Sequence, residues 1–283
     1  DAAVHPGERS RVWDSPLDTD PVMEILATAG LIILVYATGW YILSLFVRRN
    51  DIADIAWGLG YVVLCGWLIL TRPVSPVFWL IASLIVIWGV RLAWHIGRRL
   101  IGKPEDFRYR KWREEWGSTF YWRSYLQVYL LQGLLLVIIA MPILVAAGHP
   151  EARLTGWSWL AAGIWLAGFL IQAIADAQLA SFVRHRASRE DVLDTGLWRY
   201  SRHPNYFGEI LMWWAIWAIT IPLPGSWLGI VGPVTITWLL VFVSGVPMLE
   251  KRYAEHTGYQ GYRKRTSMLI PWWPDQDDDQ TAA

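Results

Sequence analysis

Seven long apolar stretches run through this chain, separated by shorter connections, most of which contain arginine. The stretches are continuous and do not alternate polar and apolar residues with a period of two, which favours helices over strands. Each is long enough, or nearly so, to cross roughly 30 Å of hydrocarbon with about 20 residues. The pattern predicts an all-α, polytopic membrane protein with about seven transmembrane helices. Their expected ranges are 22–47, 52–70, 76–97, 124–147, 157–183, 205–222 and 226–249.

The stretches follow one another without an internal repeat or a flexible linker, so residues 22–274 are expected to form one transmembrane domain. The segments on either side are polar. Residues 1–21 are acidic and contain proline, and they lack the basic start and the following apolar run of a signal peptide. Residues 275–283 are rich in aspartate. We expect both end segments to be polar tails.

The positive charges predict how the helices are oriented. Twenty of the 25 Lys and Arg residues fall in the first, third and fifth connections and in the C-terminal tail. Four fall in the N-terminal tail and in the connections of the opposite side. Cytoplasmic loops carry an excess of Lys and Arg. The N-terminus is therefore expected outside and the C-terminus in the cytoplasm.

Composition supports a membrane protein and narrows its chemistry. The 21 Trp residues are typical of the aromatic belts at the level of lipid headgroups. The net charge of +1 gives no argument for a nucleic-acid partner. The single cysteine, Cys65, excludes an internal disulfide and a cysteine-based metal cluster. The six histidines are scattered, so no metal site is predicted.

The polar run from residue 197 to residue 209 is the strongest candidate for a functional segment. Proline favours the first turn of a helix, where its missing N–H is not needed, so a helix is predicted to begin near Pro204. The positive end of this helix would lie beside Arg199, Arg202 and His203. Such an arrangement suits an anion, above all a phosphate.

Two carboxylates near this segment are further candidates. Glu209 lies one turn inside the apolar helix, where an ionisable residue is costly and indicates function. Asn205 precedes it by four residues on the same face, and Gly208 would permit close approach of a ligand or a neighbouring backbone. Asp176, in the fifth stretch, has two interpretations. It either forms a structural ion pair with Arg184, or it accepts hydrogen bonds from a cofactor while Arg184 meets phosphate.

The second and third stretches also carry polar residues. Asp54 either stabilises a helix N-terminus by its charge or faces a substrate cavity. Arg91, His95 and Arg98 recur at helical spacing and share one face. Arg98 can extend to the headgroups, whereas the other two lie deeper. His95 is either a satisfied buried residue or a group that gives or takes a proton near neutral pH.

Two polar segments are expected at the membrane surface. Residues 103–113 are predicted to be an interfacial loop that contacts anionic lipid. The amphipathic segment 249–273 is either an interfacial helix anchored by Trp272 and Trp273 or a wall of the cofactor site.

Taken together, these motifs resemble the bacterial steroid 5-alpha-reductase-like family, which is similar to eukaryotic steroid 5-alpha-reductases and sterol reductases. The resemblance extends from Asp51 to Pro274 and depends mainly on Gly-Leu-Trp-Arg-Tyr-Ser-Arg-His-Pro-Asn-Tyr-Phe-Gly-Glu at 196–209. Gln172-x-x-x-Asp176 upstream and Tyr262 with Leu-Ile-Pro at 269–271 downstream support it.

The resemblance implies a membrane reductase that binds NADPH from the cytosolic side, between the last transmembrane helices. Its expected location is the inner membrane of a bacterium, and its expected partners are a lipophilic substrate from the bilayer and membrane lipids. The positions that match the cofactor contacts of the family are Asp176, Arg184, Asn205 and Glu209, followed by Arg199, Tyr200, Arg202, His203, Tyr206 and Tyr262.

For catalysis, the steroid enzymes use a Glu and a Tyr on early helices to polarise a carbonyl group. His95 falls roughly where that Tyr lies, and Asp54 is nearest to the Glu, which has no clear equivalent here. An arginine of the steroid enzymes' tail is replaced at Thr266 or shifted to Arg265. Hydride transfer is therefore expected, with His95 and Asp54 as catalytic residues, while a steroid acceptor is less well supported.

Two alternatives stay open. Arg-His-Pro-x-Tyr also occurs in isoprenylcysteine carboxyl methyltransferases and phospholipid methyltransferases, which bind S-adenosylmethionine in a related fold. A lipid-binding membrane protein without catalytic activity is the second alternative. Asp176 and the pair Asn205 and Glu209 favour the reductase.

Overall fold

The computed structural model describes residues 21–188 and 190–275, and helices are the regular secondary structure throughout that part of the chain. The predicted tails lie mostly outside the described residues. Five long helices match five of the predicted stretches closely. They are α1 (Pro21–Val47), α2 (Ala53–Thr71), α3 (Pro76–Leu100), α8 (Gly156–His185) and α9 (Pro204–Thr220).

The other two stretches form helices interrupted by short changes of winding. The fourth stretch belongs to a helical segment made of α4 (Phe107–Trp116), η1 (Gly117–Thr119), α5 (Phe120–Ser124), η2 (Tyr125–Leu130), α6 (Leu131–Ile139) and α7 (Met141–Ala147). The seventh comprises η4 (Ser226–Ile230), α10 (Val231–Trp238) and η5 (Leu239–Val243), after which α11 (Val246–Arg252) and α12 (Thr257–Arg265) complete the chain. A short 3-10 helix, η3 (Gly196–Arg199), precedes α9.

The prediction of an all-helical, polytopic membrane protein is confirmed. Within the described residues, six helical segments are long and apolar enough to cross a membrane. α9 has 17 residues, which is at the short end of the range of roughly 17–25 for a transmembrane helix. Large apolar side chains also face outward, among them Phe46 and Leu70. A lipid bilayer explains such a surface, because large apolar side chains are rarely exposed to water in contiguous patches.

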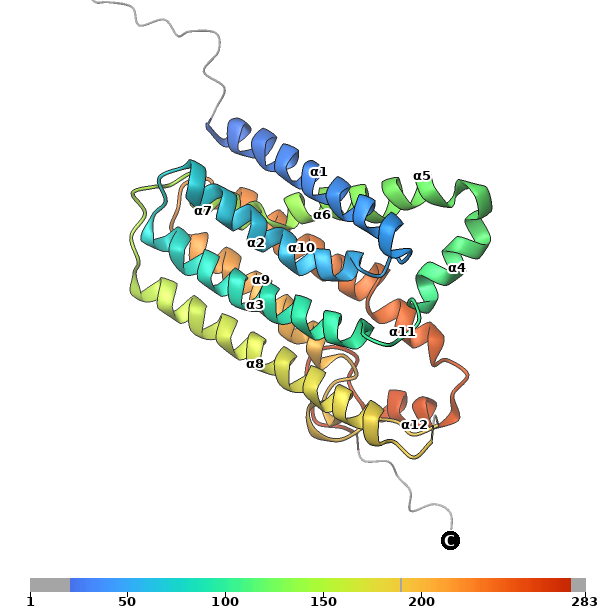
Figure 1. Cartoon of the computed structure of the whole chain (residues 1–283). Helices are drawn as coiled ribbons and strands as arrows, with labels where there is room; N and C mark the ends of the chain where they lie inside the picture. Colours follow the sequence, from blue (N-terminus) through green and yellow to red (C-terminus); the bar gives the residue numbers. More distant parts are fainter. Residues whose placement is uncertain (1–20, 189, 276–283) are drawn as a thin grey trace, which may run out of the picture.

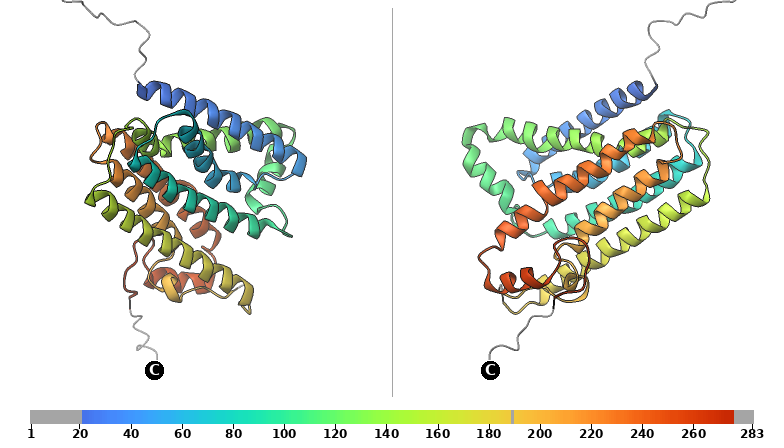
Figure 2. Two further views of the ribbon diagram at one scale, coloured as in Figure 1. Left: turned by 60° about the vertical axis from the view of Figure 1, so that its left-hand side comes forward. Right: turned by 180° about the vertical axis from the view of Figure 1, so that it is seen from behind.

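The helices form two layers. Figure 1 shows α1, α2, α3 and α8 side by side, and the view from behind in Figure 2 shows α10 and α9 in the second layer. The connections predicted to be rich in Arg all lie at one end of this bundle, where α1, α3, α8 and α11 end and α9 begins (Figure 1). The grouping expected from the charges is thus confirmed, while the sidedness in the membrane stays a prediction.

The prediction that residues 103–113 form a loop is wrong from Phe107 onward. From Phe107 onward they form α4, because the side chain of Asp106 accepts a hydrogen bond from the backbone N–H of Arg108 and caps the helix. The helix ends at Gly117, whose φ of 50° is in the left-handed region that favours glycine.

The crossing of α8 and α9 is a close contact between long helices, where two glycines face each other. A Cβ added to Gly168 would lie 2.7 Å from the carbonyl oxygen of Gly208, and one added to Gly208 would lie 2.5 Å from that of Gly168. The approach of a neighbouring backbone, one of two explanations offered for Gly208, is therefore what the structure contains. This crossing fixes the polar residues of α8 against those of α9.

We predict that Gly168→Ala lowers the free energy of unfolding by about 1–3 kcal/mol, because the added methyl group forces the two helices apart. Gly163→Ala, in the same helix, is the matched control, since a Cβ there meets nothing within 4 Å. It should leave stability unchanged or raise it by up to about 1 kcal/mol. Thermal unfolding in detergent measures both, and equal effects would contradict this account of the crossing.

Candidate functional site

Residues from three helices form a buried polar network at the crossing. Arg91 of α3 donates to Asp176 Oδ2 at 2.6 Å and to Gln172 Oε1 at 3.0 Å. The amide of Gln172 donates to Glu209 Oε2 at 2.9 Å, and that of Asn205 donates to Asp176 Oδ1 at 3.2 Å. The two carboxylates predicted to act together are thus linked through the amide of Gln172 and the guanidinium of Arg91, and Asn205 joins the network at Asp176.

The partner of Asp176 differs from the one expected. Its ion pair is with Arg91, whereas the side chain of Arg184 is exposed at the end of α8. Arg91 and Asp176 are both largely shielded from solvent, with side-chain exposures of 19% and 10%. The hypothesis of a structural Asp–Arg pair is therefore right about the type of contact and wrong about the arginine.

Glu209 is buried and only half satisfied. One carboxylate oxygen accepts from Gln172, and among the described residues no hydrogen bond reaches the other, Oε1. This oxygen is therefore available to a ligand that can donate a hydrogen bond.

The two predicted catalytic residues lie in different surroundings. His95 is half-buried one turn after Arg91 and close enough to Asp176 and Arg91 to be affected by their charges, but no hydrogen bond joins it to these two residues in the described part of the chain. Asp54 lies in another cluster, where Arg108 Nη2 donates to Oδ2 at 2.8 Å and Tyr109 Oη donates to Oδ1 at 2.8 Å. The structure does not pair Asp54 with His95.

A second polar cluster surrounds Glu250 of α11. Arg202 Nε lies 3.0 Å from Glu250 Oε1, and His203 Nε2 lies 3.4 Å from the same oxygen. Arg202 Nη1 also donates to the carbonyl oxygens of Arg263 and Thr266. Arg202 therefore ties the start of α9 to α12 and is not a free cation.

The predicted residues Tyr200 and Tyr262 hold the C-terminal segment in place. The hydroxyl of Tyr262 donates to the carbonyl oxygen of Trp198. The backbone N–H of Trp272 donates to the carbonyl oxygen of Tyr200 at 2.9 Å. The ring of Tyr200 contacts that of Trp273 edge-on, with centroids 5.4 Å apart. The tail is thus a wall beside the motif, while Trp272 and Trp273 stay exposed as expected for membrane anchors.

A cavity of about 140 Å³ lies beside His203, between the end of α8, the loop before η3, and helices α11 and α12. Its walls are mainly aromatic and aliphatic, and the Nδ1 atom of His203 is buried without a hydrogen-bond partner among the described residues. Arg184 and Arg199, exposed at this end of the bundle, are not among the lining residues. The lining includes Leu179, Phe182, Trp198, Arg202, His203, Tyr253, Tyr259 and Tyr262.

One face of α8 connects the cavity with the polar network. Gln172, Asp176, Leu179 and Val183 recur at helical spacing, so the first two face the network and the last two line the cavity. On α9, the ring of Tyr206 stacks on that of His203 with centroids 5.4 Å apart. The cavity, the start of α9 and the network therefore follow one another along the same pair of helices.

Two arginines that were not predicted to belong to the cofactor site act on Tyr206. Tyr206 interacts electrostatically with Arg99 at the end of α3 and with Arg108 of α4, besides Asp176 and Glu209. The side chain of Arg99 is exposed and forms no ion pair with any described residue. The predicted cationic site of Arg184, Arg199, Arg202 and His203 is thus only partly assembled, and Arg99 and Arg108 are cations it did not include.

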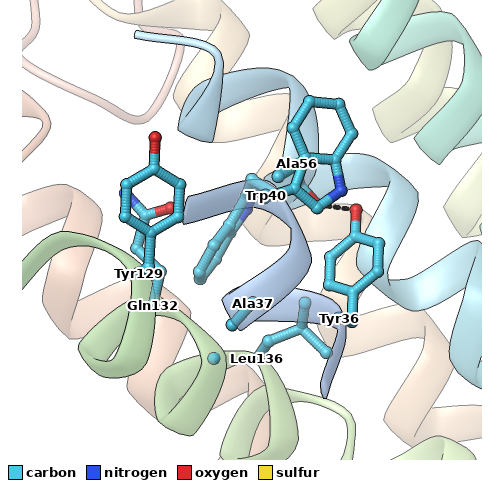
Figure 3. A pocket seen from close by; sticks show the side chains of 9 residues that line it. Tyr36, Ala37, Trp40, Ala56, Tyr129, Gln132 and Leu136 are labelled. Carbon is cyan, nitrogen blue, oxygen red and sulfur yellow. Dashed lines mark hydrogen bonds between the residues drawn. The ribbon is translucent and has the colours of Figure 1, made fainter. Parts of the chain in front are cut away.

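A smaller space of about 20 Å³ lies between α1, α2 and α6 (Figure 3). Tyr36 closes one side by donating from its hydroxyl to the carbonyl oxygen of Ala56 at 2.8 Å, while Gln132 and Tyr129 line another. The space has room for about one water molecule. Gln132 is thus a polar residue of a membrane helix that lines a small cavity.

Comparison with known proteins gives the family of the chain. The model of a family described as "Protein of unknown function (DUF1295)" matches residues 40–266. The chain belongs to this family. In general terms it is the steroid 5-alpha-reductase-like family that the 196–209 motif indicated.

The chain is also similar to a curated protein whose name assigns no activity. The chain is 25% identical over 262 residues to "Uncharacterized protein C594.04c" of the fission yeast Schizosaccharomyces pombe. The match covers 79% of this chain and 70% of that protein. No solved structure matches the chain.

We predict that Asp176→Asn lowers the free energy of unfolding by about 3–5 kcal/mol, because it leaves the charge of Arg91 buried without a counter-ion. The double variant Arg91→Met with Asp176→Leu should recover most of this loss. Glu24→Gln, which breaks the more exposed pair with Arg72, is the control and should cost at most about 1 kcal/mol. A double variant as unstable as the single one would contradict the explanation.

We also predict a pH dependence from His203. Burial lowers the pKa of this histidine below its usual 6.5, although the hydrogen bond to Glu250 opposes the shift. Because the folded protein favours the neutral ring, its stability is full above about pH 6.5 and falls as the pH drops through the lowered pKa. His203→Gln should remove this part of the decline in the thermal midpoint. His185→Gln, at an exposed site, should not.

Proposed function

We propose that this protein is an integral membrane reductase that uses NADPH to transfer a hydride to a carbon–carbon double bond of a lipophilic substrate. The observation that carries the proposal is the network of Arg91, Gln172, Asp176, Asn205 and Glu209. It places two carboxylates and two amides at a helix crossing, next to the end of the bundle where the basic connections gather.

The residues present fit the nicotinamide end of NADPH. A primary carboxamide presents two N–H donors and one carbonyl acceptor. Glu209 Oε1, which has no partner among the described residues, can accept one of these donors, and the amide of Asn205 can donate to the carbonyl oxygen. Bound there, NADPH would supply the hydride. The fixed positions of Asn205 and Glu209 would decide which ring face is presented to the substrate.

The other parts of the cofactor have matching surroundings. The cavity of about 140 Å³ has aromatic walls and an unpartnered His203 Nδ1, which suit a nucleoside base. The N-terminus of α9 provides a positive dipole end for the phosphates. Arg99 and Arg108 interact electrostatically with Tyr206 near the start of α9. Arg184 and Arg199 are exposed at the same end of the bundle. Arginine is well suited to bind phosphate through two parallel hydrogen bonds.

His95 is the residue we propose as proton donor to the substrate. It is half-buried beside Asp176 and Arg91, and it titrates near neutral pH in its usual state. Asp54 has both oxygens engaged, so we propose that it positions Arg108 through their ion pair at 2.8 Å. We further propose that the arginine-rich end faces the cytoplasm of a bacterial cell, where NADPH is available.

The Arg-His-Pro motif also supports a second candidate. The aromatic cavity at His203 suits the adenosine of S-adenosylmethionine as well as that of NADPH. An enzyme of that type would methylate a prenyl-cysteine or a lipid headgroup.

We predict that NADPH raises the thermal stability of the purified protein, because a ligand that binds only the folded state stabilises it by about 2.7 kcal/mol at a hundred times its Kd. Glu209→Gln should abolish this effect, since the altered side chain can no longer accept two hydrogen bonds through charged oxygens. Glu24→Gln, at the opposite end of the bundle, should retain it.

The same titration with S-adenosylmethionine separates the candidates. Stabilisation by S-adenosylmethionine alone would favour the methyltransferase. Stabilisation by neither compound would favour a lipid-binding protein without catalysis. An undiminished response of Glu209→Gln to NADPH would remove the proposed role of the network.

A further inference from the structure

The cavity beside His203 has an exposed end and a buried end. Its lining residues Arg186 and Asp191 are exposed, whereas Trp198, His203 and Tyr262 are buried. A molecule can therefore enter from the surface and extend to a floor without solvent. An apolar cavity of about 150 Å³ has room for a benzene ring. The volume of about 140 Å³ found here is thus suited to one edge of a flat heterocycle.

The hydrogen-bond donors on the aromatic part of this floor already have acceptors in the protein. The indole N–H of Trp198 donates to the carbonyl oxygen of Ala175 at 3.1 Å. The hydroxyl of Tyr262 donates to the carbonyl oxygen of Trp198, and that of Tyr259 donates to Glu250 Oε1 at 2.8 Å. These side chains therefore give the floor its shape, but their donors are not free to bind a ligand.

His203 differs from them, because one of its ring nitrogens has no partner. Its Nε2 lies 3.4 Å from Glu250 Oε1, and only 3% of its side chain is exposed. The other nitrogen, Nδ1, is buried, and among the described residues no group hydrogen-bonds to it. An ionised carboxylate can only accept a hydrogen bond, so the proton of the neutral ring lies on Nε2. His203 Nδ1 is therefore an acceptor.

Packing holds the ring of His203 in this orientation. One face stacks on Tyr206, with centroids 5.4 Å apart and an angle of 8° between the ring planes. The backbone N–H of His203 donates to Ser201 Oγ at 3.1 Å, which fixes the main chain at the same residue. A buried acceptor without a partner is costly. The floor of the cavity therefore favours a ligand that supplies an N–H or O–H donor.

We propose that this cavity selects adenine through its exocyclic amino group, which donates a hydrogen bond to His203 Nδ1. The aromatic walls contact the faces of the base, and the rest of the nucleotide leaves through the exposed end, where Arg186 lies. His203 is thus a residue that determines specificity for the base. The inference rests on the proposed function in one respect, namely that a nucleotide cofactor occupies this cavity.

The same arrangement rejects a base with an oxygen atom at that position. Hypoxanthine carries a carbonyl oxygen in place of the amino group, so two acceptors would face each other at His203 Nδ1. The neighbouring ring N–H of hypoxanthine could reach Nδ1 only if the base moved sideways, against the walls of the cavity. The two bases are otherwise alike in shape, and comparing them therefore isolates the proposed hydrogen bond.

The experiment compares NADPH with reduced nicotinamide hypoxanthine dinucleotide phosphate, which has this one replacement in its base. Thermal stabilisation of the full-length protein in detergent is followed over a range of concentrations of each compound. The measurement is made at pH 8, where the ring of His203 is neutral because burial lowers its pKa. The wild type should bind NADPH about tenfold more tightly, as expected for one buried hydrogen bond.

Two variants of His203 test the assignment. His203→Phe removes the acceptor and keeps a ring, so the preference should fall to about twofold or less. His203→Gln should have the same effect, because its amide can present either an oxygen or a nitrogen to the base. Equal binding of the two dinucleotides by the wild type would overturn the proposal, and so would an unchanged preference in either variant that folds.

His256→Asn is the matched control. His256 lines the same cavity, but its Nδ1 accepts from the backbone N–H of Tyr259 at 3.2 Å and caps α12. Asparagine also caps helices. This variant should therefore keep the tenfold preference for NADPH, and a loss equal to that of His203→Phe would contradict the assignment to His203.

Failure of this inference can be distinguished from failure of the proposed function. AMP and IMP differ in the same way as the two dinucleotides but lack the nicotinamide. A preference for AMP in a protein that NADPH does not stabilise would support the adenine site and reject the reductase. Stabilisation by both dinucleotides without a preference would retain the reductase and reject the role of His203. Binding of none of the four compounds would overturn both proposals.

Discussion

The ion pair between Arg91 and Asp176 is the interaction on which the centre of this bundle depends. A charge inside a membrane helix is costly unless it is paired and hydrogen-bonded. Here the guanidinium of Arg91 donates to both Asp176 and Gln172, and the amide of Gln172 donates in turn to Glu209. Three helices are therefore held in one arrangement, because sliding any of them by a turn would leave a buried charge without a partner.

That arrangement is possible only because α8 and α9 approach each other so closely. The facing glycines bring the two backbones into contact, and Gln172 and Glu209 then lie within hydrogen-bond distance. In hydrocarbon, small residues at helix crossings take the role that apolar burial has in water, since lipid tails are as apolar as leucine. The packing and the polar network thus depend on each other, and a change in one should be felt in the other.

The sequence was sufficient for the helices and for the likeness to a family, because both depend on local pattern. Long apolar runs predicted the five long helices to within a few residues. Asp176, Asn205 and Glu209 were predicted to belong to one site, and the structure places them in one hydrogen-bonded network. The pairing of Asp176 was not predictable, because Arg91 is 85 residues away and spacing says nothing about contacts between helices.

The site changes character along its length, and this change suits two different ligands. At the end of the bundle it combines exposed arginines, the start of α9 and an aromatic cavity, which a charged, soluble cofactor requires. Toward the middle of the bundle the polar network borders the buried rings of Tyr61, Trp88 and Trp213, which make the surroundings mainly apolar. Glu209 lies between the two regions. In the reaction we propose, a water-soluble hydride donor and a membrane-soluble acceptor meet without water, and Glu209 lies where they would meet.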